Sequence, residues 1–122
     1  MIRSARVAVA VAACGAAVAV SGCSGIPKDA SVKDFCVKGE KFSASKTFAT
    51  GKKRAEALAD VGTPKGIDKD ARKGFEELID RVTSSDNGSD FKKKADKLSD
   101  AEARHLRALD GYIKATCDLT TP

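Results

Sequence analysis

The sequence predicts an all-α protein: a small antiparallel bundle of four to five helices closed by one disulfide. After position 30, apolar residues recur at spacings of three and four, which is the period of an amphipathic helix. Ser and Asp residues that suit helix N-caps precede several of these segments. No segment alternates β-branched or aromatic residues over six positions, as a half-buried strand would. Helices packed on one another are therefore the expected architecture.

The first 22 residues have the layout of a secretory signal peptide. Arg3 and Arg6 supply a basic start, and residues 7–20 form an uncharged run composed mostly of Ala and Val. This run is too short for a membrane-spanning helix, which needs about 20 apolar residues. A basic start, an apolar middle and small residues at the end are typical of an export signal. Because the two arginines are not adjacent, a twin-arginine signal is not expected.

The end of this leader, Val20-Ser21-Gly22-Cys23, resembles the lipobox of bacterial lipoproteins. In that family the Cys sulfur receives a diacylglycerol and the leader is cut just before it. The resemblance implies that Cys23 is the lipidated N-terminus of an exported protein on the outer face of the cytoplasmic membrane. Two acyl chains are enough for stable anchoring. The alternative is ordinary secretion, with Cys23 as a chance residue or a disulfide partner.

Residues 23–30 are expected to form a lipidated tether, because Ser24 to Ala30 has the composition of a short linker. At 3.3–3.6 Å per residue, this tether holds a domain at most roughly 25 Å from the lipid surface. The expected organisation is a signal peptide at 1–22, the tether, a helical domain at 31–119 and a tail at 120–122.

The first helix is expected to begin after Ser31, an N-cap residue with Asp34 as its capping-box partner. At 100° per residue its inward side consists of Val32, Phe35, Gly39 and Phe42. Phe48 falls off this side, so the helix should bend or end near residues 47–51.

A short second helix is expected next, ended by Gly62 and a turn at residues 63–66. Its inward residues are Ala55, Leu58 and Ala59. Asp68 can cap a third helix. The apolar stripe of that helix consists of Ala71, Phe75, Leu78, Ile79 and Val82.

Residues 84–90 are expected to form a polar loop, and residues 91–98 a short lysine-rich helix. Ser99 and Glu102 then make a capping box for the last helix. The apolar line of the last helix consists of Ala103, Leu106, Leu109, Ile113 and Cys117.

The chain has four cysteines, at positions 14, 23, 36 and 117. The first leaves with the leader and Cys23 would be alkylated, which leaves Cys36 and Cys117 near the two ends of the domain. Disulfides persist outside the cytoplasm, so these two are predicted to be bonded. Closing a loop of about 82 residues stabilises a fold by roughly 4.5 kcal/mol in the chain-entropy account. A redox pair is the alternative, although redox cysteines are usually close in sequence.

Several short motifs resemble those of a group of small actinobacterial lipoproteins. They are Phe35-Cys36, Val61-Gly62-Thr63-Pro64 followed by Gly74-Phe75, and Tyr112 five residues before Cys117. The similarity spans roughly residues 31–119. It implies an all-helical fold whose ends are joined by a Cys pair, and it carries no activity.

Catalytic, cofactor and metal motifs fail on inspection. Residues 50–53 lack the first Gly and the final Ser or Thr of a phosphate loop. Residues 86–90 lack the first ligand and the closing Glu of a calcium loop. We therefore expect no cofactor, no metal and no enzymatic activity.

Two residues of the last helix are weak candidates for a binding site. His105, the only histidine, is expected at the boundary of the apolar stripe or exposed, and a metal site would need more ligands. Asp110 lies close to the stripe. It is either an ion-pair partner of Arg107 or Lys114, or a carboxylate that anchors a ligand between helices.

Basic residues gather at 52–54 and in a second cluster of Lys92, Lys93, Lys94 and Lys97. Such a cluster is either a solvated helix face or a surface for anionic lipid or wall polymer. The intervening Asp90, Asp96 and Asp100 favour the first interpretation. Residues 23–122 carry 20 basic and 17 acidic side chains, a net charge of +3. With no aromatic residues among the lysines, no nucleic-acid partner is expected.

The leading functional hypothesis is a non-enzymatic, lipid-anchored module that binds or supports another envelope component. The alternatives are a small-ligand binder with a pocket between helices, and an envelope enzyme or an inhibitor of one. A solidly packed bundle favours the first. A sizeable apolar cavity with inward polar groups favours the second, and a cleft around His105 or an acid with a perturbed pKa favours the third.

Overall fold

The computed structural model describes residues 25–117, which form five helices and no strand. They are α1 (Val32–Ser43), α2 (Phe48–Val61), α3 (Lys69–Thr83), α4 (Gly88–Ala95) and α5 (Asp100–Cys117). This confirms the predicted small all-α fold of four to five helices. The leader, Cys23 and the last five residues lie outside the described part of the chain.

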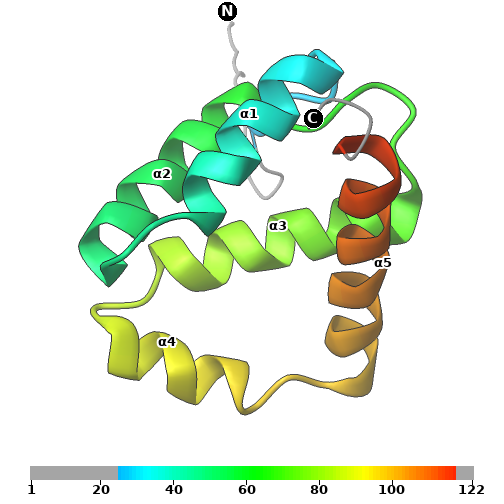
Figure 1. The fold of residues 1–122 in the computed structure, drawn as a ribbon. Coiled ribbons are helices and arrows are strands. Elements are labelled where there is room, and N and C mark those ends of the chain that lie inside the picture. The colour runs from blue at the N-terminus through cyan, green and yellow to red at the C-terminus, as the bar shows by residue number, and fades with distance from the viewer. Residues whose placement is uncertain (1–24, 118–122) are drawn as a thin grey trace, which may run out of the picture.

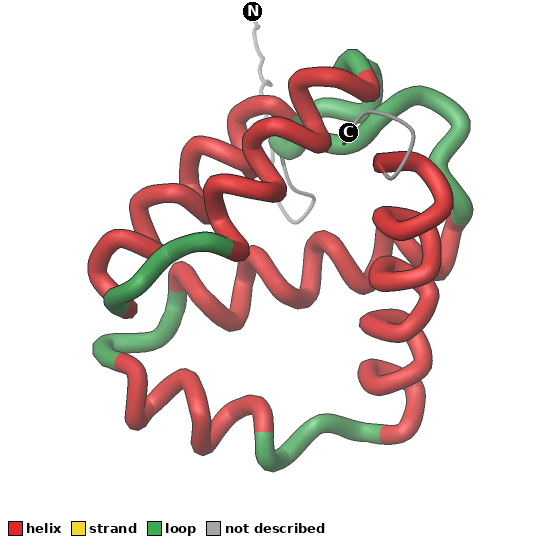
Figure 2. Tube along the Cα trace, in the orientation of Figure 1, coloured by secondary structure: helices red, strands yellow, loops and turns green. Residues whose placement is uncertain are grey.

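The helices fall into two groups, as Figure 1 shows. Helices α1 and α2 form a hairpin joined by residues 44–47, and α3, α4 and α5 form three sides of a frame. The tube in Figure 2 shows the loops at the corners of this frame. Helix α3 is the central element, because it contacts α2, α4 and α5. Helix α5 packs mainly on α3 and more sparsely on α1.

The predicted N-caps account for most helix starts. The Ser31 hydroxyl accepts from the Asp34 N–H at 3.0 Å, and the Asp68 carboxylate accepts from the Ala71 N–H at 3.2 Å. At α5 the predicted capping box is complete: Ser99 Oγ accepts from the Glu102 N–H at 3.1 Å, and the Glu102 carboxylate accepts from the Ser99 N–H at 2.9 Å. These bonds satisfy backbone donors that a helix start leaves unpaired.

Helix boundaries differ from the prediction in two regions, because short polar residues act as caps. Helix α1 already ends at Ser43, and the Thr47 hydroxyl accepts from the Thr50 N–H at 3.1 Å to start α2, which is longer than expected. Likewise, the Asn87 side chain accepts from the Asp90 N–H at 2.8 Å. Helix α4 therefore begins inside the expected polar loop and ends earlier than predicted.

The core lies where α1, α2, α3 and α5 meet. Its buried members are Phe35, Cys36, Ala55, Leu58, Phe75, Ile79, Val82 and Leu109. All of these except Cys36 are predicted inward residues, but the prediction for Val32 is wrong. Val32 is 40% exposed, because burial along α1 begins only at Phe35.

Two glycines mark places where backbones touch. A Cβ on Gly74 would overlap the carbonyl group of His105, so the absence of a side chain lets α5 lie directly on α3. Gly62, which ends α2 with a φ of 86°, is similarly close to the carbonyl group of Pro27. A larger residue at either position would force the two backbone segments apart.

Residues 26–30, expected to be part of the tether, are held on the domain. The Ala30 N–H donates to the Thr63 carbonyl and the Thr63 N–H donates to the Pro27 carbonyl, both at 3.1 Å. The Arg72 guanidinium donates to the carbonyls of Ile26 and Pro27, both at 2.9 Å. We call residues 26–30 the strap. Because the strap is bonded to the α2–α3 turn and to α3, the folded domain begins about five residues earlier than predicted.

Candidate functional site

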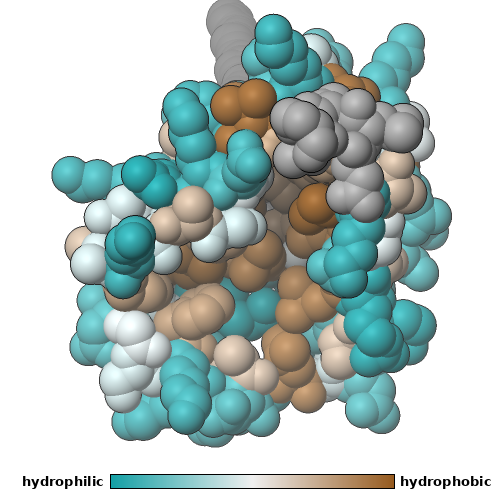
Figure 3. All heavy atoms as spheres, in the orientation of Figure 1, coloured by the Kyte–Doolittle hydropathy of each residue, from teal (hydrophilic) through white to brown (hydrophobic). Residues whose placement is uncertain are grey.

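An apolar cleft of about 550 Å³ opens between α1, α3 and α5. Its lining residues are Lys33, Phe35, Cys36, Val37, Gly39, Glu40, Phe42, Ser43, Leu58, Phe75, Leu78, Leu109, Ile113 and Cys117. Figure 3 shows apolar side chains in the hollow between the helices and polar side chains around it. The sequence left open whether the bundle is packed solid or contains an apolar cavity, and an apolar cavity is present.

Aromatic rings form the floor of this cleft. Phe35 and Phe75 are 2% and 1% exposed, and their ring centroids lie 5.9 Å apart. The ring of Tyr112, which is not part of the cleft lining, lies 6.0 Å from that of Phe35 in an edge-on arrangement. Contacts at these distances fix the rings against one another, so the floor is a rigid part of the core.

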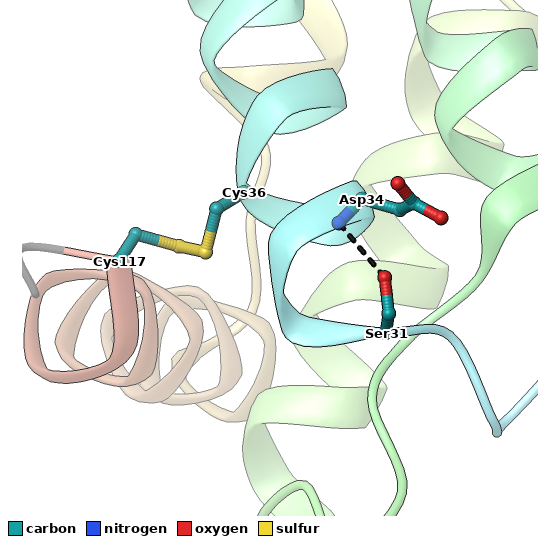
Figure 4. The surroundings of a disulfide bond; sticks show 4 residues. All are labelled: Ser31, Asp34, Cys36 and Cys117. Atoms are coloured by element: carbon teal, nitrogen blue, oxygen red, sulfur yellow. Dashed lines mark hydrogen bonds between the residues drawn. A yellow bond between two sulfur atoms is a disulfide. The ribbon is translucent and has the colours of Figure 1, made fainter. Parts of the chain in front are cut away.

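The predicted disulfide between Cys36 and Cys117 is present and bounds the cleft. It joins α1 to the last residue of α5, with the two Cα atoms 5.5 Å apart, and both cysteines line the cleft. Figure 4 shows the bond crossing between the two helices, close to the Ser31 cap that starts α1. The bond fixes the spacing of α1 and α5 at this end of the cleft.

Among the described residues, the polar groups of the cleft all come from α1. Helices α3 and α5 contribute only Phe75, Leu78, Leu109, Ile113 and Cys117, whereas α1 contributes Lys33, Glu40 and Ser43. Lys33 and Glu40 are seven residues apart, which places them on the same side of α1, two turns from each other. This arrangement suits a ligand with an apolar body and a polar end directed toward α1.

Of the two positions expected for His105, a boundary or an exposed site, the exposed one does not hold. His105 is 9% exposed and its Nδ1 atom lies 2.9 Å from a carboxylate oxygen of Glu77 on α3. The close approach of α5 at Gly74 brings this side chain against α3. His105 does not line the apolar cleft, so the structure brings no histidine to that site.

Asp110 is an ion-pair partner, the first of its two interpretations. Its carboxylate lies 3.1 Å from Lys114 Nζ one turn along α5, and the two side chains are mostly exposed. An exposed ion pair of this kind contributes little to stability. Asp110 does not line the cleft.

The lysines of the 92–97 cluster do not act as a group. Lys94 Nζ donates to the Ser84 carbonyl at 2.9 Å and pairs with Asp90 at 3.5 Å, which ties α4 to the end of α3. Lys92, Lys93 and Lys97 are exposed. In the other basic cluster, Lys52 donates to the Ser85 carbonyl at 3.0 Å. Some basic residues therefore connect elements and others are solvated.

Two exposed carboxyl groups have altered pKa values, both through helix starts. The N–H of Asp86 donates to Asp90 and, with Lys94 nearby, lowers the pKa of that carboxyl. The N–H of Ser99 donates to Glu102, which lowers its pKa from the usual 4.5. Both groups favour the ionised form because they accept hydrogen bonds. Neither of them lines the cleft.

Within residues 25–117, no group of three or more His, Cys, Asp or Glu side chains is arranged to hold a metal ion. In the same range, no helix has the length and apolar character needed to cross a membrane.

Sequence reasoning missed Arg72, which holds the strap. This side chain is 8% exposed although it is charged. In addition to the strap carbonyls, it donates to Thr63 Oγ1 at 2.7 Å and to Glu76 at 2.8 Å. The charge is thus buried with four of its five N–H donors satisfied, as a buried charge requires. Position 72 lies beside the apolar stripe of α3, and no local signal identifies its partners some 45 residues earlier in the chain.

No protein-family model matches the chain, and no curated protein or solved structure similar to it was found.

Proposed function

We propose that the chain is a lipid-anchored protein of the extracytoplasmic face that binds an apolar ligand in the cleft between α1, α3 and α5. The cleft itself carries this proposal. Its volume, about 550 Å³, falls within the range of small-molecule sites, about 300–1,000 Å³. Its shape is fixed by the disulfide and by the aromatic floor. The ligand-binding alternative thus gains weight over a purely supporting module.

The exposed apolar lining supports a binding role. Leaving apolar side chains open to water is unfavourable, at roughly 25 cal/mol per Å². The disulfide bounds this lining at one end, where it joins α1 to the last residue of α5. An apolar ligand that fills the cleft removes this lining from water, which favours binding.

The anchor is supported by the lipobox at residues 20–23 and fits a domain that carries a disulfide. A protein tethered beside a bilayer meets amphiphilic molecules, and the polar edge of α1 suits one with a single polar end. The proposal includes no catalysis, since the sequence carries no catalytic motif and His105 is paired with Glu77 outside the cleft.

A matched pair of glycine variants tests the cleft. Gly39 lines it and Gly111 does not, and a Cβ built on either glycine has no atom within 4 Å. A version starting at Gly25 keeps all five helices, the core and the disulfide. A fluorescent fatty acid such as cis-parinaric acid serves as the probe.

We expect Gly39→Phe to fill the cleft and weaken probe binding at least about ten-fold, equivalent to about 1.4 kcal/mol. Gly111→Phe should bind the probe like the parent protein. Far-UV circular dichroism of both variants verifies that the fold is kept. Absence of probe binding by the parent, or equal binding by the two folded variants, contradicts the proposal.

A further inference from the structure

A second concave site lies on a different face of α3, beside the strap. It has a volume of about 350 Å³ and is lined by Lys28, Pro64, Gly66, Ile67, Lys69, Arg72, Lys73 and Glu76. The strap contributes Lys28, the α2–α3 turn contributes the next three residues and the first two turns of α3 contribute the rest. We call it the basic pocket.

The charges in the basic pocket are not balanced. Among the described lining residues, Glu76 is the one acid, and it is paired with Arg72 at 2.8 Å. The two terminal nitrogens of Arg72 donate to the strap carbonyls and to Thr63. Lys28, Lys69 and Lys73 therefore remain, and in the described part of the chain none of these three has a carboxylate oxygen within 4.0 Å.

Neighbouring acids do not compensate for these lysines. Asp68 and Asp70 are close in sequence but do not line the pocket. The Asp68 carboxylate is engaged in capping α3, where it accepts from the N–H groups of Asp70 and Ala71. The pocket is thus a local concentration of positive charge on a surface of mixed charge.

This arrangement opposes the stability of α3. Lys69 and Lys73 are four residues apart, a spacing at which like charges destabilise a helix. Lys69 is the first residue of α3, where the helix macrodipole also disfavours a cation. An anion in the pocket would reduce both penalties, whereas a merely solubilising surface would not require three lysines to line one pocket.

We propose that the basic pocket binds a phosphate group, and that its source is the headgroup of an anionic lipid. The choice of a lipid headgroup as the source of the phosphate depends on the lipid anchor, which is part of the proposed function. Lys28 is five residues from Cys23, so it lies at most about 18 Å along the chain from an anchor at that position. Arg72 holds the strap on α3, so the pocket keeps a fixed place relative to the start of the domain.

Helix α4 provides an internal control. Figure 1 shows α4 at the end of the molecule opposite the start of α1 and the α2–α3 connection. Its exposed lysines, Lys92 and Lys93, together with Lys97, have the same chemistry as the pocket lysines but a remote position. Lysine acetylation followed by mass spectrometry reports both groups in one molecule.

The full lipidated chain is placed in nanodiscs of phosphatidylcholine, with or without phosphatidylglycerol, at physiological salt. A third sample contains phosphatidylcholine and added inorganic phosphate. We expect phosphatidylglycerol to slow acetylation of Lys28, Lys69 and Lys73 about five-fold, the scale of one lysine's attraction to an anionic surface, and to leave Lys92, Lys93 and Lys97 unchanged. Protection by free phosphate alone keeps the phosphate site but overturns the lipid source.

A single substitution distinguishes a pocket from simple shielding by the bilayer. Lys73→Gln should remove the protection of Lys28 and Lys69, because the three share one anion, whereas Lys93→Gln should not. Equal acetylation in all three samples, equal protection of both lysine groups, or protection that survives Lys73→Gln overturns the proposal. If the chain does not remain with the nanodiscs, the anchor is refuted. The phosphate sample, repeated without lipid, then tests separately whether the basic pocket binds phosphate.

Discussion

Helix α5 is attached to its two neighbours in opposite ways. Against α3, the missing side chain of Gly74 lets the backbones touch, and His105 is held between the helices by Glu77. Against α1, contact is sparser, the Cys36–Cys117 bond spans the gap, and the apolar cleft lies beside it. Close packing leaves no space between α5 and α3. The cleft lies where α5 meets α1 more sparsely and the disulfide supplies the connection.

The largest effect is expected from removing the covalent attachment. The double substitution Cys36→Ala and Cys117→Ala should lower the free energy of unfolding by about 4 kcal/mol, because the unfolded chain regains the entropy of an open loop. Urea denaturation measures this change, and reduction of the parent protein should reproduce it. A double variant as stable as the oxidised parent would show that packing alone holds α1 and α5 together.

A smaller loss is expected at the packed attachment. Gly74→Ala places a Cβ against the carbonyl group of His105, which no side chain can relieve, and should cost about 2–3 kcal/mol as overpacking. Thermal unfolding measures it. Gly111→Ala, on the exposed side of α5, is the matched control and should stabilise by about 0.5–1 kcal/mol through helix propensity. If both changes have the same sign, the backbones are not in contact.

Removing the cap of α5 should have a smaller effect still. Ser99→Ala deletes the hydroxyl that accepts from the Glu102 N–H and should cost about 1 kcal/mol, with no change in the cleft. Chemical denaturation gives the value. Ser89→Ala, at an exposed site within α4, is the control and should be close to neutral. An equal loss of stability in the Ser89→Ala and Ser99→Ala variants would show that the cap does not stabilise α5.

The smallest effect concerns the pH dependence of the same cap. The pKa of Glu102 is below its usual 4.5 in the folded protein because the Ser99 N–H donates to it. The carboxyl therefore adds stability at pH values above its unfolded pKa, and this contribution is lost as pH falls through the folded pKa. With Glu102→Gln, the free energy of unfolding should depend less steeply on pH in the acid range. Parallel pH profiles for the two proteins would contradict this.

Much of the fold could be predicted because it is encoded locally. Ser31, Asp68 and the Ser99–Glu102 box cap the helices predicted for them, and the cysteine pair was identified without the fold. Thr47 and Asn87 were assigned to bends or loops although they cap helices. Short polar side chains form hydrogen bonds with the backbone both in loops and at helix starts. Local sequence therefore does not distinguish a loop residue from a helix cap.

The site could not be predicted in the same way, because it depends on distances between helices. Periodicity placed His105 at the edge of an apolar stripe, but its burial follows from Gly74 on another helix. The cleft exists because α1 and α5 stay apart, which no single helix pattern encodes. Arg72 reaches Pro27, 45 residues away, and nothing near either residue indicates that contact.

The disulfide also makes residues 36–117 a covalent ring. A protease that reaches this domain is expected to cut at an exposed connection such as residues 86–87, because loop tips are the preferred cleavage sites. In an open chain such a cut would release the downstream piece. Here both pieces remain joined through sulfur, so one cut leaves a single covalent molecule that still includes the strap and α5. Two cuts within the ring are needed to free any fragment of it.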